Sequence, residues 1–302
     1  MFQSILYVFA GFVISLFAIG LERSSDFSAI LNKIIMALIN SAFSPIITFA
    51  MLFILERITN ITTDLRLQEF NNLNHPLLVK LNDIAPGTYQ HTQSLAFLAE
   101  RCASAINANP LLTRVGAYFH DIGKIIKPEY FAENQMDIQS KHDLLSPKKS
   151  AEAIRNHVHE GIRLAKEYNL PQRIIDFIPM HHGTTLIKHF YAKALEEAGD
   201  KLIKEEDFRY PGPKPSTKEA AIVMICDSVE AVSRVIGLKD FEELEKAIDK
   251  IIKEKFLDGQ FDECNISLKE LRVIEDTCAK NLIGSSHQRI QYKELPDNNL
   301  NS

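Results

Sequence analysis

The sequence predicts an all-α protein in which two transmembrane helices precede a helical globular domain. Residues 1–21 and 34–55 contain no charged residue, and several later segments combine a helix-start signal with apolar residues at helical spacing. No segment shows the sustained alternation that is typical of a strand. With 302 residues, the chain has room for one substantial domain and a smaller region beside it.

The membrane region is predicted over residues 1–60. As a helix, each uncharged stretch spans roughly 30 Å, the thickness of a bilayer's hydrocarbon core. A cleaved signal peptide is the alternative for the first stretch, although no basic residue precedes it, and a buried core helix is the alternative for the second. The lipid bilayer is therefore an expected partner.

Charge and cysteine content narrow the functional classes. The net charge of −5 and the lack of a basic stripe argue against DNA or RNA polymers as partners. An anionic ligand would therefore need local positive charge, which bound divalent metals supply. The four cysteines are widely spaced and form no Cys-x-x-Cys motif, which favours a reducing, cytosolic location for the domain.

The first predicted elements after the membrane region lead to a His-Asp pair. Residues 61–85 are expected to form a helical connector that Pro76 interrupts, either a coupling element or a simple tether. A helix over 88–106 carries His91 near its start. A second helix is expected from Asn109 as N-cap to Gly123 as its stop, which places the adjacent His120 and Asp121 in its last turn.

Later helices bring further candidate ligands. Ser146-Pro147 begins a helix that carries His157 and His159, and Pro171 begins another that Gly183 closes after His181-His182. The segment 196–215 is charged and then rich in proline and glycine, so it is read as an irregular loop.

The C-terminal part is predicted from two capping boxes. Ser216-x-x-Glu219 is predicted to cap a helix that contains Asp227, and Ser267-x-x-Glu270 to cap a late amphipathic helix. Asp227 lies in a strongly apolar run, where an ionised carboxylate is costly unless a metal or a helix-to-helix hydrogen bond satisfies it. The tail over 293–302 is polar and expected to be disordered.

The candidate ligands are imidazoles and carboxylates, a set that can hold divalent metals, and Asp121 can bridge two of them. They are His91, His120, Asp121, His157, His181, His182 and Asp227.

Their order and spacing resemble the HD superfamily of metal-dependent phosphohydrolases, and more specifically the seven-transmembrane HD-domain (PgpH-like) cyclic-di-AMP phosphodiesterase family. The resemblance covers about residues 85–292 and rests on five motifs. These are PGTYQH at 86–91, VGAYFHDIGK at 115–124, ENQ at 133–135, HHGTT at 181–185 and EDFRYPGPK at 206–214. It implies an HD-domain helical fold over 86–292, cyclic di-AMP as a cyclic dinucleotide substrate, and the bacterial inner (cytoplasmic) membrane as location, with the catalytic domain cytosolic.

The resemblance also implies roles for the ligands. His91, His120, Asp121 and Asp227 would hold one divalent metal, and Asp121 would bridge to a second metal held by His157, His181 and His182. Iron or manganese suits these ligands, while zinc, cobalt and magnesium stay open. A metal-bound hydroxide would attack phosphorus and yield linear pApA. Because His159 would point away from His157 on a helix, only one of the two should reach the metals, and the resemblance selects His157.

Four further residues are candidate catalytic or substrate-binding groups. Lys124 is expected to act with Asp121 in catalysis by adding positive charge at the reacting phosphate, with a solvated lysine as the alternative. Asn134, Arg209 and Tyr210 are candidate substrate contacts, with plain loop structure as the alternative.

Two departures from the family pattern leave alternatives open. The family has seven membrane helices and this chain has room for two, which implies a truncated or split form. The Gly-Tyr-Pro signature of cyclic-di-GMP hydrolases is replaced by Gly183-Thr184-Thr185. The competing functions are an HD-type phosphohydrolase of another nucleotide or alarmone, a non-catalytic nucleotide sensor, and a membrane scaffold that acts as a homo-oligomer.

Overall fold

The computed structural model describes residues 10, 11, 14, 27–59, 61–135, 140–199, 202–236 and 241–286. Among these residues the secondary structure is helical, and the extended pairing is limited to an isolated bridge between Leu186 and Arg209. The all-α prediction is therefore confirmed for the part of the chain that is described. The chain divides into two compact units, Met1–Thr63 and Asp64–Ser302.

The N-terminal unit contains helix α2 (Phe27–Thr59). Its segment Leu31–Glu56 has a mean hydropathy of 2.0 and is long and apolar enough to cross a membrane. Apolar side chains along it are exposed, including Met36, Phe43 and Ile47, as expected for a helix that faces lipid. The first predicted span lies outside the described residues except at 10, 11 and 14, and so does the predicted tail.

The predicted connector forms two short helices, α3 (Asp64–Phe70) and α4 (Pro76–Ile84). Pro76 occupies the first turn of α4, where its missing N–H costs nothing, so it begins a helix instead of interrupting one, and α3 already ends at Phe70. Leu67 and Leu77 are fully buried in the main hydrophobic core. These two helices are therefore part of the packed C-terminal unit.

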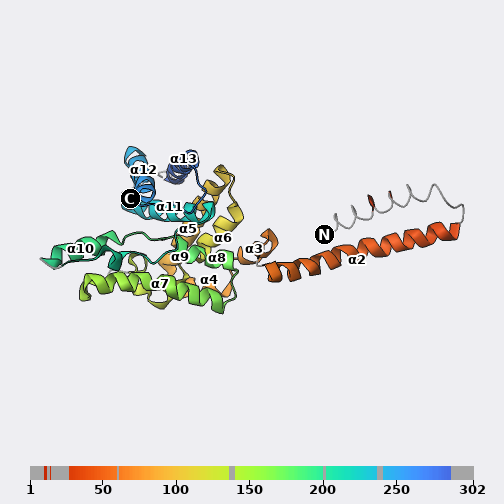
Figure 1. The fold of residues 1–302 in the computed structure, drawn as a ribbon, viewed down its shortest axis with the longest axis horizontal. Coiled ribbons are helices and arrows are strands. Elements are labelled where there is room, and N and C mark those ends of the chain that lie inside the picture. The colour runs from red at the N-terminus through yellow and green to blue at the C-terminus, as the bar shows by residue number, and fades with distance from the viewer. Residues whose placement is uncertain are drawn as a thin grey trace, which may run out of the picture. The chain divides into compact units, whose positions relative to one another are not determined.

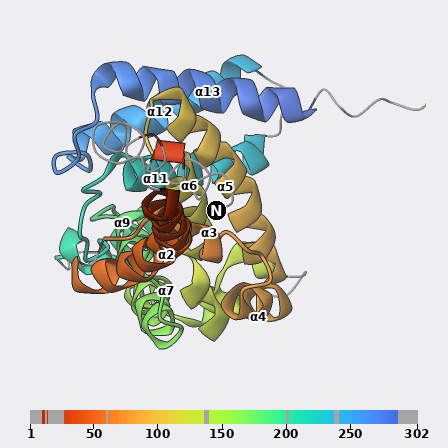
Figure 2. The ribbon, with the colours of Figure 1, turned by 90° about the vertical axis from the view of Figure 1, so that its right-hand side faces the viewer.

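The centre of this unit is built from α5 (Pro86–Ala105), α6 (Pro110–Phe119) and α11 (Lys218–Ile236), which pack against one another. Helix α7 (Pro147–Glu167) covers one side of this centre, and α12 (Phe241–Leu257) with α13 (Leu268–Ser286) covers the opposite side (Figure 1, Figure 2). The buried face of α11 is almost wholly apolar over 220–226, which is why this helix can lie inside the bundle.

Several short helices connect these elements. The α-helical ones are α8 (Gln172–Ile175), α9 (Phe177–Met180) and α10 (Lys188–Ala198). The 3₁₀ turns are η1 (Ile122–Ile126), η2 (Pro128–Tyr130), η3 (Ala132–Asn134), η4 (Lys141–Leu144) and η5 (Glu205–Phe208). The single helix predicted from Pro171 to His182 is thus two short helices that meet at Asp176.

The helix that leads to the His-Asp pair begins as predicted and ends earlier. Asn109 Oδ1 accepts a hydrogen bond from Leu112 N at 2.9 Å, which confirms the N-cap. The α-helix ends at Phe119, His120 is its C-cap, and the chain continues through Asp121 into η1. The prediction that Gly123 stops the helix was wrong.

Gly123 is instead required by packing. A Cβ atom on it would lie 1.8 Å from the carbonyl oxygen of His157 and 2.5 Å from the amide nitrogen of Gly161. Because both atoms belong to the backbone of α7, a side chain at 123 would force the two segments apart.

One of the two predicted capping boxes is confirmed. The hydroxyl and amide of Ser267 donate to Glu270 Oε2, each at 2.8 Å, at the start of α13. At α11 the prediction was wrong, because Thr217 Oγ1 accepts from Ala220 N at 3.2 Å. Glu219 Oε1 instead accepts a hydrogen bond from the backbone amide of Asn109 at 2.8 Å. A local sequence pattern does not reveal this long-range partner.

Candidate metal centre

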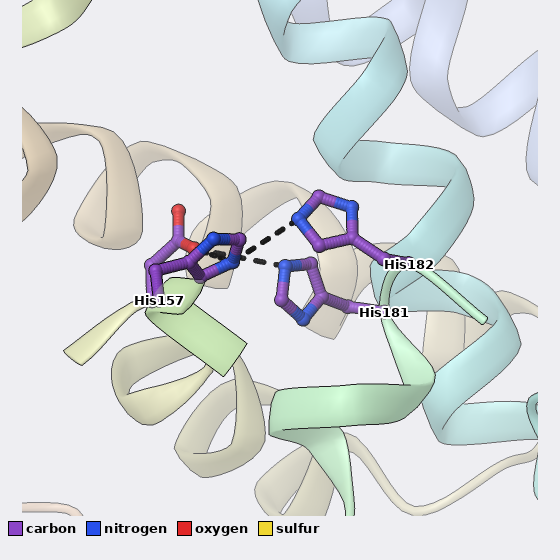
Figure 3. A group of neighbouring side chains, drawn as sticks. His157, His181 and His182 are labelled. Carbon is purple, nitrogen blue, oxygen red and sulfur yellow. Dashed lines mark hydrogen bonds and ion pairs between the residues drawn. The ribbon is translucent and has the colours of Figure 1, made fainter. Parts of the chain in front are cut away.

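The seven predicted ligands converge in two adjoining groups. His91, His120 and Asp227 form the first group, and Asp121, His157, His181 and His182 form the second group. Within each group the candidate ligand atoms lie within 4.8 Å of one another. Figure 3 shows the imidazoles of His157, His181 and His182 gathered around one point, with His157 coming from α7 and the other two from the turn after α9.

Asp121 lies between the two groups and presents one oxygen to each. Its Oδ2 lies 3.1 Å from His120 Nε2 and 4.0 Å from His91 Nε2. Its Oδ1 lies 3.4 Å from His157 Nε2 and 3.6 Å from His181 Nε2. The side chain is only 2% exposed. This is the arrangement that a bridging carboxylate requires.

Three imidazoles are oriented by their own helices. The Nδ1 atom of His120 bonds to Ala117 O at 2.7 Å, and the Nδ1 atom of His181 bonds to Phe177 O at 3.0 Å. His157 Nδ1 bonds in the same way to Ile154 O, three residues earlier, at 2.5 Å. A carbonyl can only accept, so each Nδ1 carries the proton and each Nε2 keeps a lone pair directed at Asp121.

His91 is held by two carboxylates on α11. Its Nε2 lies 3.1 Å from Asp227 Oδ1, and its Nδ1 lies 2.8 Å from Glu230 Oε2. Burial disfavours the charged imidazole, but these two partners outweigh it and raise the pKa of His91 to about 10. The same negative surroundings that hold a proton there would favour a divalent cation.

Sequence reasoning missed Glu230, which fixes the ring of His91 from the side opposite Asp227. The available signal is the spacing Asp227-x-x-Glu230, which places both carboxylates on one face of a helix. A carboxylate that accepts from the second nitrogen of a ligating histidine is a recurrent feature of metal sites.

The residues present fit a metal centre, as three orphaned polar atoms indicate. His120 Nε2, Asp121 Oδ1 and His181 Nε2 are buried and have no hydrogen-bond partner among the described residues. Unpartnered buried polar atoms are costly, and here all three face the junction of the two groups. The donor set, neutral imidazole and carboxylate without thiolate, suits iron or manganese.

The second group keeps its imidazoles neutral. Burial lowers the pKa of His181 to about 3, and burial also lowers the pKa of His157 and of His182. Metal ligation requires neutral imidazole, so these shifts leave the ligands free of competing protons at neutral pH.

Lys124 lies largely buried beside the carboxylate of Asp121. Its Nζ lies 2.8 Å from Asp121 Oδ2 and 2.7 Å from Glu133 Oε1. Burial disfavours its charge, but the two carboxylates raise its pKa above the usual range. Lys124 is therefore a fixed cation at the site, and the solvated lysine of the alternative interpretation is not what the structure places there.

The three candidate substrate contacts already have protein partners. Asn134 bonds the backbone amide and hydroxyl of Thr88 at 3.1 and 2.9 Å, which ties η3 to the start of α5. Arg209 donates to Thr184 O and forms a two-pronged pair with Asp258. The Tyr210 ring stacks on His182, with ring centroids 3.9 Å apart.

The two histidines of α7, His157 and His159, differ in burial, and only His157 faces the candidate metal centre. His157 has a side chain that is 2% exposed and faces Asp121, whereas the side chain of His159 is 80% exposed.

Comparison with known proteins places this arrangement in a family. Residues 88–232 match the HD domain family. The crystal structure of the HD domain of L. monocytogenes phosphodiesterase PgpH in complex with cyclic-di-AMP is 51% identical, with a TM-score of 0.68. The alignment covers 72% of this chain and all of that one. The chain belongs to the HD-domain family.

Two longer proteins are also similar to this chain. The cyclic-di-AMP phosphodiesterase PgpH of Listeria monocytogenes is 50% identical over 242 residues, and that of Bacillus subtilis is 44% identical over 260 residues. These alignments cover 80% and 86% of this chain. They cover 33% and 36% of the relatives, so the chain spans about a third of the length of the curated relatives it matches.

Proposed function

We propose that this chain is a membrane-anchored phosphodiesterase that hydrolyses cyclic di-AMP to linear pApA with two divalent metal ions, iron or manganese. The observation that carries the proposal is Asp121, whose two carboxylate oxygens face two separate groups of ligands. The HD-domain family and the named relatives support a metal-dependent phosphohydrolase. The HD domain that holds cyclic-di-AMP in its crystal structure supports this substrate.

Each group has a distinct task in the proposed reaction. His91, His120 and Asp227 would hold one ion, His157, His181 and His182 the other, and Asp121 would bridge them. When bound, the two ions supply positive charge to the phosphate oxygens and allow water to act as a nucleophile near neutral pH.

The remaining residues prepare the site for a phosphodiester. Glu133 and Asp121 hold the Lys124 ammonium in place, so its charge can act on a phosphate without reorganisation. The stacked Tyr210 and His182 rings close one side of the centre. With two divalent ions bound the site would be positive, and a positive site within a chain of net charge −5 fits a small dianionic ligand better than a nucleic-acid polymer.

The location is proposed from two observations. Leu31–Glu56 can anchor the chain in a bacterial cytoplasmic membrane, and all four cysteines are free, as expected for a domain in the reducing cytosol. Fractionation of cells, with protease added to intact spheroplasts, tests this proposal. Protection of the domain and its recovery with membranes are expected, and cleavage from outside would overturn the topology.

A substrate panel tests the activity. Purified full chain, loaded with iron or manganese, is offered cyclic di-AMP, cyclic di-GMP, linear dinucleotides and alarmones. We expect pApA from cyclic di-AMP as the main product. A preference for another nucleotide would overturn the proposed substrate. Binding of cyclic di-AMP without turnover would indicate a sensor.

The matched variant is Asp121→Ala, which removes the proposed bridge. We expect loss of turnover by at least a thousandfold, because two-metal assistance and ligand geometry fail together, and a depleted metal content. Full activity in this variant would refute the metal assignment.

A further inference from the structure

A second cluster of metal-binding side chains lies in the hydrophobic core, separate from the proposed metal centre. Cys102 on α5, Cys226 on α11 and Cys278 on α13 are each fully buried. Their sulfur atoms form a nearly equilateral triangle, with separations of 3.5 Å (Cys102 to Cys278), 3.8 Å (Cys102 to Cys226) and 3.9 Å (Cys226 to Cys278). We call these residues the thiol triad.

The dimensions of the thiol triad suit a single bound atom. From the three separations, each sulfur lies about 2.2 Å from the centre of the triangle. A thiolate ligand lies at about 2.3 Å from a tetrahedral ion such as zinc. An atom of similar size would therefore fit just above the plane of the sulfurs with little movement of the three helices.

The surroundings of the triad select among possible occupants. Ala99, Ala103, Ile225 and Ile274 belong to the same fully buried core, so a charged product would be costly there. Three thiolates around zinc leave a net charge of −1 and an unfilled fourth position, and three around monovalent copper leave −2. Trivalent arsenic or antimony forms three bonds to sulfur, needs no fourth ligand and gives a neutral product.

We propose that the thiol triad is a binding site for a trivalent, thiophilic oxyacid of the arsenite class. In the binding step three As–O bonds of arsenous acid break and three As–S bonds form. Each thiol proton leaves with one hydroxyl as water, so three waters are released and no group is oxidised or reduced. The bound atom cross-links α5, α11 and α13.

The probe is sodium arsenite, added to the reduced full chain. Native mass spectrometry should show one arsenic atom added with the loss of three hydrogens, and the unfolding temperature should rise because three helices become linked. Cys278→Ala should lose this adduct. Cys264→Ala is the matched control, because Cys264 is also buried but lies outside the triad, and it should keep the adduct.

X-ray absorption at the arsenic edge, measured on the unsubstituted chain, counts the ligands directly. Three sulfur neighbours and no oxygen are expected, whether or not the alanine variants fold. Two sulfurs with one oxygen, an adduct that Cys264→Ala abolishes, or no adduct at all would overturn the proposal.

Discussion

Arg209→Ala tests whether this arginine holds the second group or contacts the substrate. Arg209 donates to Thr184 O at 2.8 Å, and its guanidinium pairs with Asp258 at 2.9 and 3.1 Å. Gln260 Oε1 accepts from the Thr184 amide at 3.0 Å, and its Nε2 donates to Asp258 Oδ2 at 2.8 Å. Thr184 follows His182 by two residues. The network therefore anchors the turn that carries two of the proposed ligands.

The expected cost follows from these contacts. The Arg209 side chain is 28% exposed, and it also pairs with Glu205. The side chains of Asp258 and Glu205 are 31% and 41% exposed, so we count the two ion pairs together at about 1 kcal/mol. The hydrogen bond from a charged donor to Thr184 O contributes a further ~1–2 kcal/mol. The total of roughly 2–3 kcal/mol corresponds to a fall of about 5–10 °C in unfolding temperature for a unit of this size.

The metal content separates the two roles. If Arg209 positions the turn, Arg209→Ala should weaken metal binding at the second group by about 10–100-fold, as loss of an outer-shell partner does. Calorimetric metal titration and thermal unfolding measure both effects. Arg209→Lys keeps the charge without the planar fork and should restore only part of the loss.

Arg163→Ala is the matched control. Arg209 pairs with two carboxylates, Asp258 and Glu205, and Arg163 likewise pairs with two, Glu160 and Glu167. Arg163, however, lies on the outer face of α7 with a half-exposed side chain. It should change neither the unfolding temperature nor the metal content. Wild-type stability and metal content in Arg209→Ala, with a raised KM, would refute the positioning role and favour a substrate contact.

Three other substitutions test single contacts. Glu230→Gln should lower metal affinity at the first group by about tenfold, because the His91 ring keeps a hydrogen-bond partner but that partner is no longer negatively charged. An unchanged calorimetric titration would show that the charge of Glu230 is dispensable. Gly123→Ala should destabilise the domain by about 1–3 kcal/mol in urea unfolding, because its methyl group meets the α7 backbone; wild-type stability would contradict the packing argument. His159→Ala should leave the metal content of the purified protein unchanged because this side chain is exposed, and loss of one equivalent would mean that the wrong histidine of α7 was selected.

Helix starts were predictable because they depend on neighbouring residues. Proline in the first turn marks α6 and α7, and the side chains of Asn109 and Ser267 cap the helices that follow them. Such signals act over three or four residues, so they can be recognised in the sequence without knowledge of the fold. They fail where a distant group competes. Glu219, for example, accepts a hydrogen bond from the backbone amide of Asn109 and does not form its predicted capping box.

The candidate ligands could also be named from the sequence, since histidines and aspartates at five separate places in the chain carry their chemistry with them. Their grouping was not. That Asp121 divides its oxygens between two groups, and that Glu230 supports His91, depends on how α5, α7 and α11 pack.

By itself, the sequence determined the helical class, several helix starts and the identity of the candidate metal ligands, because these depend on local backbone preferences and on side-chain chemistry. Only the tertiary structure decided that Gly123 serves packing and that Arg209 bonds to the turn that follows His181 and His182. It also showed that three widely spaced cysteines share one point in the core. Those relations join residues tens to hundreds of positions apart, and close packing of the helices, which no local pattern encodes, brings them together.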